Sequence, residues 1–394
     1  MRHRAILAGI SGAAFLGPFT QTVYTPSLLE LQRFFAVNTV LINLTISLFT
    51  AILALSNFVV GPLADTRGRR AVLLPGLLIF SAGSALCLVS GSYGWFLAGR
   101  AVQACGISTA LLVAPTVIGD IYPPESRARA MSVYQTVSFL GPVFGPVIGG
   151  IIAAYLSWRW AFALLAVAGL VAWRYNFRRL HETLPHTAAR PPITAATFRR
   201  VLANRSALAI VLIGFSQFYG YYAFLVFLPG LLTSLFALST GVKGLFFVPL
   251  TAGILLGIYV GARWQRRWSR TRILTASSYG IGVNVLILWL ALRIGVVDMP
   301  LLIAFLLVYG VLLGCSLPVQ STILVNLFAK DKGTAVGVYN LLRFTGAAIG
   351  PMVGGMVAMR FGLDAVFLNV AILLGGSAIL IHRYLYDPFD ASTG

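Results

Sequence analysis

Long apolar runs separated by short polar turns make up most of this chain. Twelve of them are long enough to cross a bilayer as helices, because about 20 apolar residues suffice. The predicted spans are residues 5–28, 39–63, 71–90, 94–120, 130–155, 159–177, 207–234, 243–263, 271–292, 299–327, 334–358 and 363–386. The pattern predicts an all-α membrane protein with twelve transmembrane helices.

A polar stretch interrupts the apolar pattern once. Residues 178–206 are rich in Arg, Pro and Thr, and they separate the first six predicted spans from the last six. We therefore expect three parts: an N-terminal six-helix bundle over residues 1–177, a cytoplasmic linker over 178–206 and a C-terminal six-helix bundle over 207–394.

An internal repeat supports this division into halves. Residues 130–150 and 335–355 share a Val-Tyr pair, a Gly-Pro pair and a Gly-Gly pair at a constant offset of 205 residues, without a gap. Half-to-half repeats of this kind indicate two related bundles with a substrate path at their interface near the middle of the membrane. The repeat therefore predicts a pseudo-symmetric pair of six-helix bundles.

The composition excludes a soluble protein. The chain is 58% hydrophobic and 10% charged, with a mean hydropathy of +0.88, whereas soluble domains carry about 25% charged residues. Its net charge of +19 would suggest nucleic acid in a soluble protein. Of the 29 Lys and Arg residues, however, 22 lie in the tails and alternate loops and five in the other loops. This bias predicts cytoplasmic termini and argues against a nucleic-acid partner.

Neither a metal site nor an enzyme active site is predicted. Cys87, Cys105 and Cys315 fall in apolar spans, where packing is the expected role. The four histidines lie in tails or the linker without metal-ligand spacing, and there is no nucleophile–base set. We therefore expect no cofactor and no enzymatic activity. The N-terminal apolar run continues without a cleavage site, so we interpret it as the first span and not as a signal peptide.

A basic turn between the second and third predicted spans is the most informative motif. The segment Gly61-Pro-Leu-Ala-Asp65-Thr-Arg-Gly-Arg69-Arg70 resembles the loop signature of the major facilitator superfamily, G-x-x-x-D-R-x-G-R-R/K. It departs from that signature at Thr66 and matches it at Gly61, Asp65, Gly68, Arg69 and Arg70. Because three arginines do not cross a membrane easily, the turn is predicted on the cytoplasmic side.

The acid in this turn suggests a mechanical role. We expect Asp65 to cap the N-terminus of a neighbouring helix, where a carboxylate is favoured, and Arg69 to pair with Asp120 at the end of the fourth span. The resemblance implies that these contacts, together with Gly61 and Gly68, form a latch that holds an outward-open state. The alternative is that the arginines only mark the cytoplasmic side.

A Gly-Pro segment in the fifth span is similar to the G-x-x-x-G-P-x-x-G-G signature of drug:proton antiporters in the same superfamily. It matches at Gly141, Gly145, Pro146, Gly149 and Gly150. This resemblance implies export. Glycines four residues apart also let helix backbones approach closely, and the second half carries a copy of the segment, so a tight helix crossing is the alternative.

Two arginines are predicted inside spans. Arg100 and Gln103 resemble the family's fourth-span signature R-x-x-Q-G, with Ala104 in place of the glycine; the resemblance implies a part in proton movement, through an influence on nearby acids. Asn340 and Arg343 resemble the N-x-x-R of fungal quinidine-resistance and polyamine exporters, which implies that Arg343 lines a cavity. A snorkelling Arg100 and a carbonyl-bound Arg343 are the structural alternatives.

Acidic residues are absent from the middle of the predicted spans. Many relatives carry an acid in the first span, where this chain has Thr22, and Glu30 toward the outer end is the nearest acid. A cavity with arginines and no deep acid favours neutral or anionic substrates. Glu30 is a candidate for proton coupling or the cavity. Weaker candidates for the cavity surface are Thr22, Tyr24, Gln217 and Tyr221, since packing is the default role of such residues.

These patterns predict a monomeric secondary transporter with the major facilitator fold in the inner (plasma) membrane. Our first hypothesis is proton-coupled, multidrug-type efflux by alternating access. The alternative is a dedicated exporter of an anionic metabolite, such as a carboxylate siderophore. The expected partners are a small neutral or anionic substrate, protons and the lipid bilayer. A receptor, a membrane enzyme and a channel are disfavoured.

Overall fold

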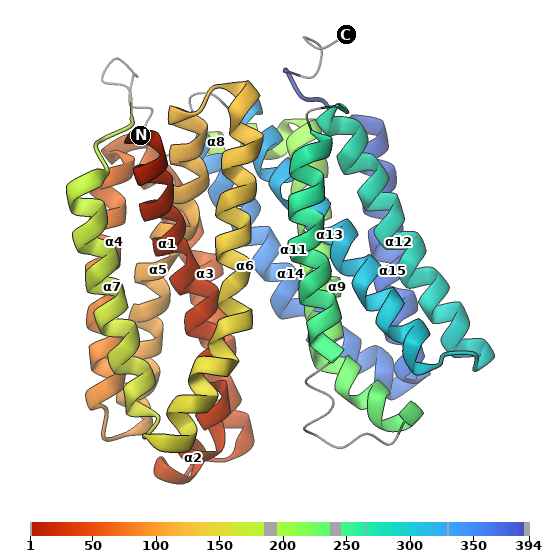
Figure 1. Ribbon diagram of the computed structural model, residues 1–394, viewed down its shortest axis with the longest axis horizontal. Helices are drawn as coiled ribbons and strands as arrows, with labels where there is room; N and C mark the ends of the chain where they lie inside the picture. Colours follow the sequence, from red (N-terminus) through yellow and green to blue (C-terminus); the bar gives the residue numbers. More distant parts are fainter. Residues whose placement is uncertain (1, 185–194, 237–245, 266, 329–330, 390–394) are drawn as a thin grey trace. The chain divides into compact units, whose positions relative to one another are not determined.

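The structure is a computed structural model that describes residues 2–184, 195–236, 246–265, 267–328 and 331–389 (Figure 1). All regular structure in these ranges is helical. The first half forms α1 (Arg2–Thr22), a 3₁₀ turn η1 (Thr25–Ser27), α2 (Leu28–Phe34), α3 (Thr39–Arg67), α4 (Arg69–Val89), α5 (Tyr93–Ile121), α6 (Pro124–Tyr155) and α7 (Arg159–Arg179). The second half forms α8 (Ala195–Ala203), α9 (Arg205–Phe236), α11 (Phe247–Trp264), α12 (Arg270–Ile294), α13 (Met299–Leu327), α14 (Lys332–Phe361) and α15 (Leu363–Tyr384).

Twelve helices in the described ranges are long and apolar enough to cross a membrane. The predicted all-α fold with twelve transmembrane helices is therefore confirmed. The helix α13 covers Met299–Leu327 as predicted, whereas α9, at Arg205–Phe236, extends beyond the predicted 207–234 at both ends. Its first residue is charged, so hydropathy alone places the start of the span later in the chain.

The chain divides into two compact units. The first unit is Met1–Thr197 together with Phe328–Leu341, and the second is Phe198–Leu327 together with Leu342–Gly394. The first turns of α14 therefore group with α1 to α7 and not with the rest of their own helix. The stretch predicted as a linker includes the short helix α8.

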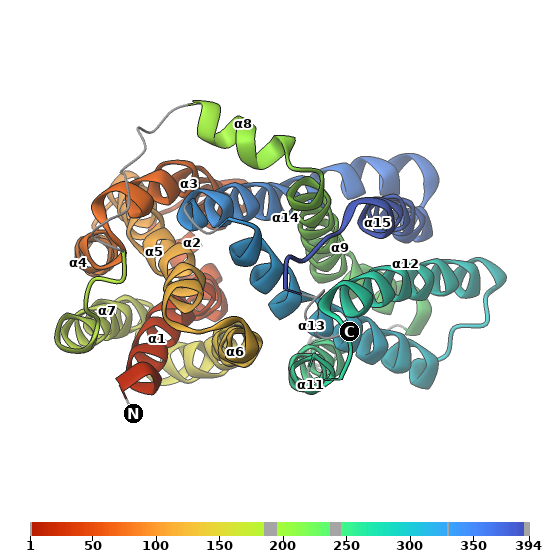
Figure 2. The same ribbon diagram turned by 90° about the horizontal axis from the view of Figure 1, so that it is seen from above.

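Helices at equivalent places in the repeat pack together within each unit. In the first unit α4 packs against α5 and α7, and α1 packs against α7 (Figures 1 and 2). In the second unit α12 packs against α13 and α15, and α9 packs against α15. The third and sixth spans of each half are thus neighbours, α4 with α7 and α12 with α15.

Glycines set how closely some of these helices approach. A Cβ on Gly106 of α5 would overlap the backbone nitrogen of Phe80 on α4. A Cβ on Gly314 of α13 would overlap the carbonyl oxygen of Ile254 on α11. Small residues at such crossings let membrane helices pack backbone against backbone. The α4–α5 crossing therefore depends on the missing side chain at position 106.

We expect Gly106→Ala to lower the free energy of unfolding by about 1–3 kcal/mol, the usual cost of overpacking. Gly94→Ala on the same helix is the matched control, since the added Cβ meets no atom of another segment within 4 Å. At that position alanine, the better helix former, should leave stability unchanged or raise it. Thermal unfolding of the two purified variants, followed by circular dichroism, measures the difference; coincident curves would contradict the packing account.

Candidate functional site

The basic turn between α3 and α4 is held by a buried arginine. Gly68 joins the two helices with φ of +104°, a conformation that favours glycine. Arg69, which is 1% exposed, starts α4. Its Nε donates to Asp120 Oδ2 at 3.0 Å, and its Nη1 donates to the Ala64 carbonyl at 2.6 Å. The same Nη1 lies 3.1 Å from Asp65 Oδ1, so one guanidinium contacts two carboxylates.

The Asp65 carboxylate caps the first turn of α14 within the first unit. It accepts hydrogen bonds from the backbone N–H of Gly333 at 2.9 Å and of Thr334 at 2.7 Å, and from the Thr334 hydroxyl at 2.8 Å. Gly61 lies one turn before it on α3, and a Cβ there would come within 2.8 Å of the Gly333 carbonyl oxygen. This close approach brings the α14 N-terminus, with its unpaired amides and positive dipole end, to the carboxylate.

A lysine from α14 reaches the same cluster. Lys332 Nζ lies 2.9 Å from Asp120 Oδ1 and donates to the Gly119 carbonyl at 2.8 Å. Asp120 therefore carries two cations, Arg69 on one oxygen and Lys332 on the other. We call this cluster the latch; it consists of Gly61, Asp65, Gly68, Arg69, Asp120, Lys332, Gly333 and Thr334.

Two latch neighbours escaped the sequence analysis. The Glu182 carboxylate, just after α7, accepts from the backbone N–H of Arg69 at 2.8 Å and of Arg70 at 3.1 Å, and so caps α4. The adjacent Thr183 hydroxyl donates to Asp120 Oδ2 at 3.0 Å. The end of the sixth span is thereby tied to the start of the third.

The internal repeat contains the signal that would have identified this acid. Asp387 lies 205 residues after Glu182, the offset of the repeat, and follows the twelfth span. In the second unit its Oδ2 pairs with Arg270 Nη1 at 2.9 Å and its Oδ1 accepts from Asn326 at 3.0 Å. Arg270 starts α12, as Arg69 starts α4. Each half therefore has an acid after its sixth span that binds the basic start of its third.

Arg100 of α5 is fully buried among polar and aromatic groups. Its Nη1 donates to Gln103 Oε1 at 2.8 Å, and Gln103 Nε2 donates to the Ser84 hydroxyl at 2.7 Å. Its guanidinium carbon lies 4.5 Å from the ring centre of Tyr24 and 4.3 Å from that of Phe49. No carboxylate in the described part of the chain pairs with it, and its Nε has no partner there. Aromatic faces and amides thus stabilise this charge.

Thr22 and Glu30 form their hydrogen bonds with backbone groups and not with Arg100. The Thr22 hydroxyl is 3.2 Å from the Pro18 carbonyl in its own helix and 3.4 Å from the Gly141 carbonyl of α6. Glu30 is exposed and accepts from the backbone N–H of Trp158 at 3.3 Å, before α7. The position where relatives carry an acid is therefore a packing position between α1 and α6.

The five residues of the fifth-span signature differ in how closely they pack against other helices. A Cβ on Gly141, Gly145 or Gly149 would overlap atoms of α1 or of the residues that follow it. A Cβ on Gly150 would meet nothing within 4 Å, and Pro146 is exposed. In the second unit, equivalent glycines of α14 approach α9 in the same way. Three of the glycines therefore serve a close helix crossing.

Arg343 of α14 lies against aromatic rings in the second unit. Its guanidinium carbon is 4.0 Å from the ring centre of Phe218 and 5.3 Å from that of Phe344. Asn340, one turn earlier, belongs to the first unit, where its Nδ2 donates to Asn57 Oδ1 at 3.3 Å. The two residues of the N-x-x-R resemblance thus have different surroundings.

Gln217 and Tyr221 on α9 also differ in their surroundings. Gln217 is fully buried, and its Oε1 accepts from the Ser316 hydroxyl at 3.0 Å and from Gln320 Nε2 at 2.8 Å. It therefore links α9 to α13. Tyr221 is half-buried, with its ring centre 5.6 Å from that of Tyr222. Of the two, Tyr221 is the better placed to meet a ligand.

Acids occupy only helix ends in the described part of the chain. Each described Asp or Glu lies in the first or last turn of a helix or outside the helices, while the two arginines above lie well inside α5 and α14. Within the described residues, no group of three His, Cys, Asp or Glu side chains could hold a metal ion. The described positive charges inside spans therefore have no described acid at the same depth of their own helices.

Comparison with known proteins places this geometry in a family. The sequence model of the Major Facilitator Superfamily matches residues 10–297 and 278–393. Citrate exporter 1 of Aspergillus niger is 31% identical over 175 residues, which are 44% of this chain and 33% of that protein. Multidrug resistance protein 3 of Bacillus subtilis is 35% identical over 126 residues, which are 32% of this chain and 25% of that protein.

A solved structure extends the likeness to the whole fold. The crystal structure of the human organic anion transporter MFSD10 matches with a TM-score of 0.81 at 20% sequence identity, covering 97% of this chain and 100% of that one. At this identity the match concerns the fold alone. Since the family match spans nearly all of the sequence and the twelve-helix fold agrees with it, the chain belongs to the major facilitator superfamily.

Proposed function

We propose that this protein exports small organic anions or neutral molecules from the cytoplasm in exchange for protons. As a member of the major facilitator superfamily it is a multi-pass membrane protein of a transporter family. The proposal places it in the plasma membrane with both termini in the cytoplasm. The observation that carries the proposed substrate class is the placement of charge: Arg100 and Arg343 lie inside spans, and every described acid lies at a helix end or outside the helices.

A guanidinium inside a span selects the sign of its ligand. Two unit charges 4 Å apart interact by about 4 kcal/mol at an effective dielectric constant of about 20. An approaching carboxylate gains an energy of this order, and a cation loses it unless an acid offsets the charge. The citrate exporter among the relatives supports this substrate class for our chain.

Alternating access needs contacts that form in one state and break in the other. We propose that the latch is such a contact, since Asp65 and Asp120 bind α14 through three backbone or side-chain N–H donors and one hydroxyl. On the predicted cytoplasmic side, a closed latch corresponds to the outward-open state. Opening it would release the start of α14 and admit a substrate from the cytoplasm.

Coupling to protons is proposed on the resemblance at Arg100 and Gln103. Arg100 does not titrate itself, because a guanidinium stays charged. Its charge instead makes a neighbouring protonated group less favourable, so its effect is on other groups in the path. Dissipating the pH gradient should therefore stop export.

Polyspecific drug efflux is the second candidate. The fifth-span signature favours it, as does the multidrug resistance protein among the relatives. Phe218, Tyr221 and Tyr222 form an aromatic cluster, with ring centres 5.6–6.3 Å apart, that suits flat apolar compounds. The two candidates differ in the charge of the preferred substrate, which makes them separable by experiment.

The proposed topology can be tested with single cysteines in a variant that lacks the three native ones. We expect a cysteine at Gly91 to react with an impermeant maleimide from outside the cell, because the charge bias predicts an external loop there. A cysteine at Arg199 of α8 should react only after the membrane is opened. Labelling of both positions from the same side would contradict the twelve-span topology with cytoplasmic termini.

The latch is tested by removing one partner at a time. We expect Asp65→Asn and Arg69→Ala each to reduce transport roughly tenfold or more, since hydrogen bonds to charged groups contribute about 1.5–3 kcal/mol. Thr66→Ala and Arg67→Ala are the controls: Thr66 bonds only within α3, and Arg67 is exposed. Transport is measured in vesicles at equal protein content. Unchanged transport in both latch variants would show that the cluster does not limit the cycle.

The substrate class is tested at Arg343. We expect Arg343→Ala to weaken export of a tricarboxylate at least fivefold while it leaves a neutral substrate nearly unchanged. Arg343→Lys should restore part of the loss, because an ammonium keeps the charge but not the planar two-point contact. The measurement is efflux of labelled citrate, of an uncharged compound and of the cation ethidium from cells with and without the protein. Efficient ethidium export that is unaffected by Arg343→Ala would instead favour the drug exporter.

A further inference from the structure

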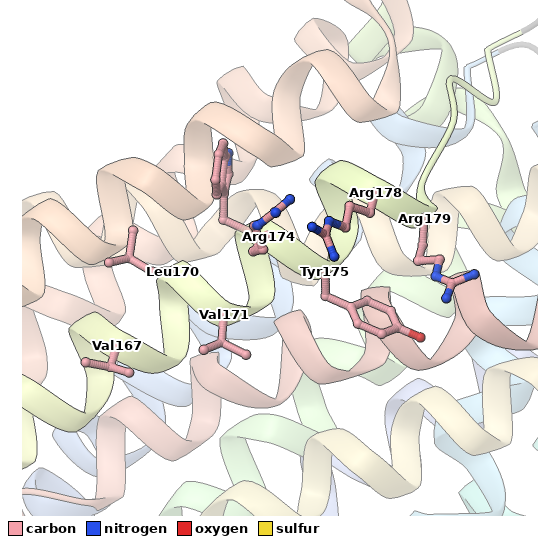
Figure 3. Close-up of a pocket in the computed structure, with 8 residues that line it drawn as sticks. Val167, Leu170, Val171, Arg174, Tyr175, Arg178 and Arg179 are labelled. Atoms are coloured by element: carbon pink, nitrogen blue, oxygen red, sulfur yellow. The ribbon is translucent and has the colours of Figure 1, made fainter.

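A groove of about 610 Å³ runs along an exposed face of α7 (Figure 3). None of the residues that line it belongs to the latch, and neither Arg100 nor Arg343 lines it. Every residue that lines it comes from this one helix: Val167, Leu170, Val171, Trp173, Arg174, Tyr175, Arg178 and Arg179.

The groove has an apolar part and a cationic part. Val167 and Val171 are 59% and 62% exposed and form the apolar part with Leu170. The cationic part is formed by Arg174 and Arg178, which lie one turn apart on the helix (Figure 3), together with Arg179. All three arginines are exposed. Over the described ranges, no carboxylate forms an ion pair with any of the three.

The neighbouring groups reinforce this polarity. Arg70 adds a further positive charge, since its Nη2 donates to the Phe177 carbonyl at 3.0 Å. Tyr175 donates from its hydroxyl to the Ala5 carbonyl of α1 at 3.2 Å, which holds its ring beside the arginines. Trp173 and Tyr175 are residue types enriched at the membrane–water interface. We therefore expect the cationic part to lie at the level of the lipid headgroups and the valines to lie closer to the middle of the bilayer.

The length of the groove matches one leaflet. From Val167 to Arg179 a helix rises about 18 Å at about 1.5 Å per residue. Half of the hydrocarbon core of a bilayer is about 15 Å thick. An acyl chain lying along the valines would therefore bring its phosphate to the level of the arginines.

We propose that this groove is a binding site for one anionic phospholipid. The phosphate binds Arg174 and Arg178, with Arg179 at its edge, and one acyl chain lies along Val167 and Val171. A zwitterionic lipid fits less well, because its ammonium group would approach several guanidinium groups. Basic pockets at a membrane surface are known to select anionic headgroups. The proposal does not depend on the substrate or direction of transport.

The experiment measures lipid retention by the purified, intact protein in native mass spectrometry. The probes are phosphatidylglycerol, phosphatidylcholine and inorganic phosphate. The test variant is Arg174→Gln/Arg178→Gln. The matched control is Arg263→Gln/Arg267→Gln, which removes two exposed arginines at the end of another span. A third variant, Arg174→Lys/Arg178→Lys, keeps the charge and separates loss of binding from loss of folding.

We expect the native protein and the control to retain phosphatidylglycerol in preference to phosphatidylcholine. The glutamine variant should lose this preference by about 25-fold, since each arginine near an anionic surface contributes about a factor of five. The lysine variant should keep most of it. Equal retention of the two lipids by the native protein, equal behaviour of test and control variants, or displacement of the lipid by millimolar inorganic phosphate would each overturn the proposal.

Discussion

The buried carboxylate of Asp65, near the end of α3, needs hydrogen-bond donors, and the donors that it binds are backbone groups at the start of α14. Asp65 is 4% exposed, and an unpaired charge at such a site costs several kcal/mol. The N–H groups of Gly333 and Thr334 stabilise it, and these are groups that the first turn of a helix leaves unpaired in any case. The bond thus satisfies both partners at once. The donors are backbone groups, yet position 333 is constrained as well, since a Cβ there would come within 2.7 Å of the Gly61 carbonyl oxygen and 2.8 Å of Asp65 Oδ1.

Asp120 extends this constraint to the rest of the cluster. Its two oxygens bind Arg69 of α4 and Lys332 of α14, and Thr183 donates to the oxygen that Arg69 uses. Because each cation reaches a different oxygen, either contact can break without exposing an unpaired buried carboxylate. Glu182 meanwhile holds the α4 N-terminus from the other side. In the proposed mechanism, α14 would be released while Glu182 and the Arg69–Asp120 contact keep the α3–α4 turn intact.

The spans and the family were predictable from sequence because both depend on local patterns. Hydropathy over about 20 residues locates a helix, and the Gly61–Arg70 segment is contiguous. Glu182 and Asp387 could not be found in this way, since each acts on a residue more than a hundred positions away and neither lies in a recognised motif. Gln217 shows a different limit: sequence made it a weak candidate for the cavity surface, and the structure adds that its amide oxygen accepts hydrogen bonds from α13. Residue type alone does not distinguish a packing amide from a binding one.

The bilayer explains why the span charges are arginines on aromatic rings. A carboxylate partner would neutralise Arg100, but it would also remove the field that a passing ligand experiences. Tyr24 and Phe49 stabilise the guanidinium through their quadrupoles without cancelling its charge. Phe218 and Phe344 also lie against the Arg343 guanidinium in the second unit. A charge stabilised in this way remains positive toward its surroundings, so the proposed preference for anions would not require a flexible partner to move away first.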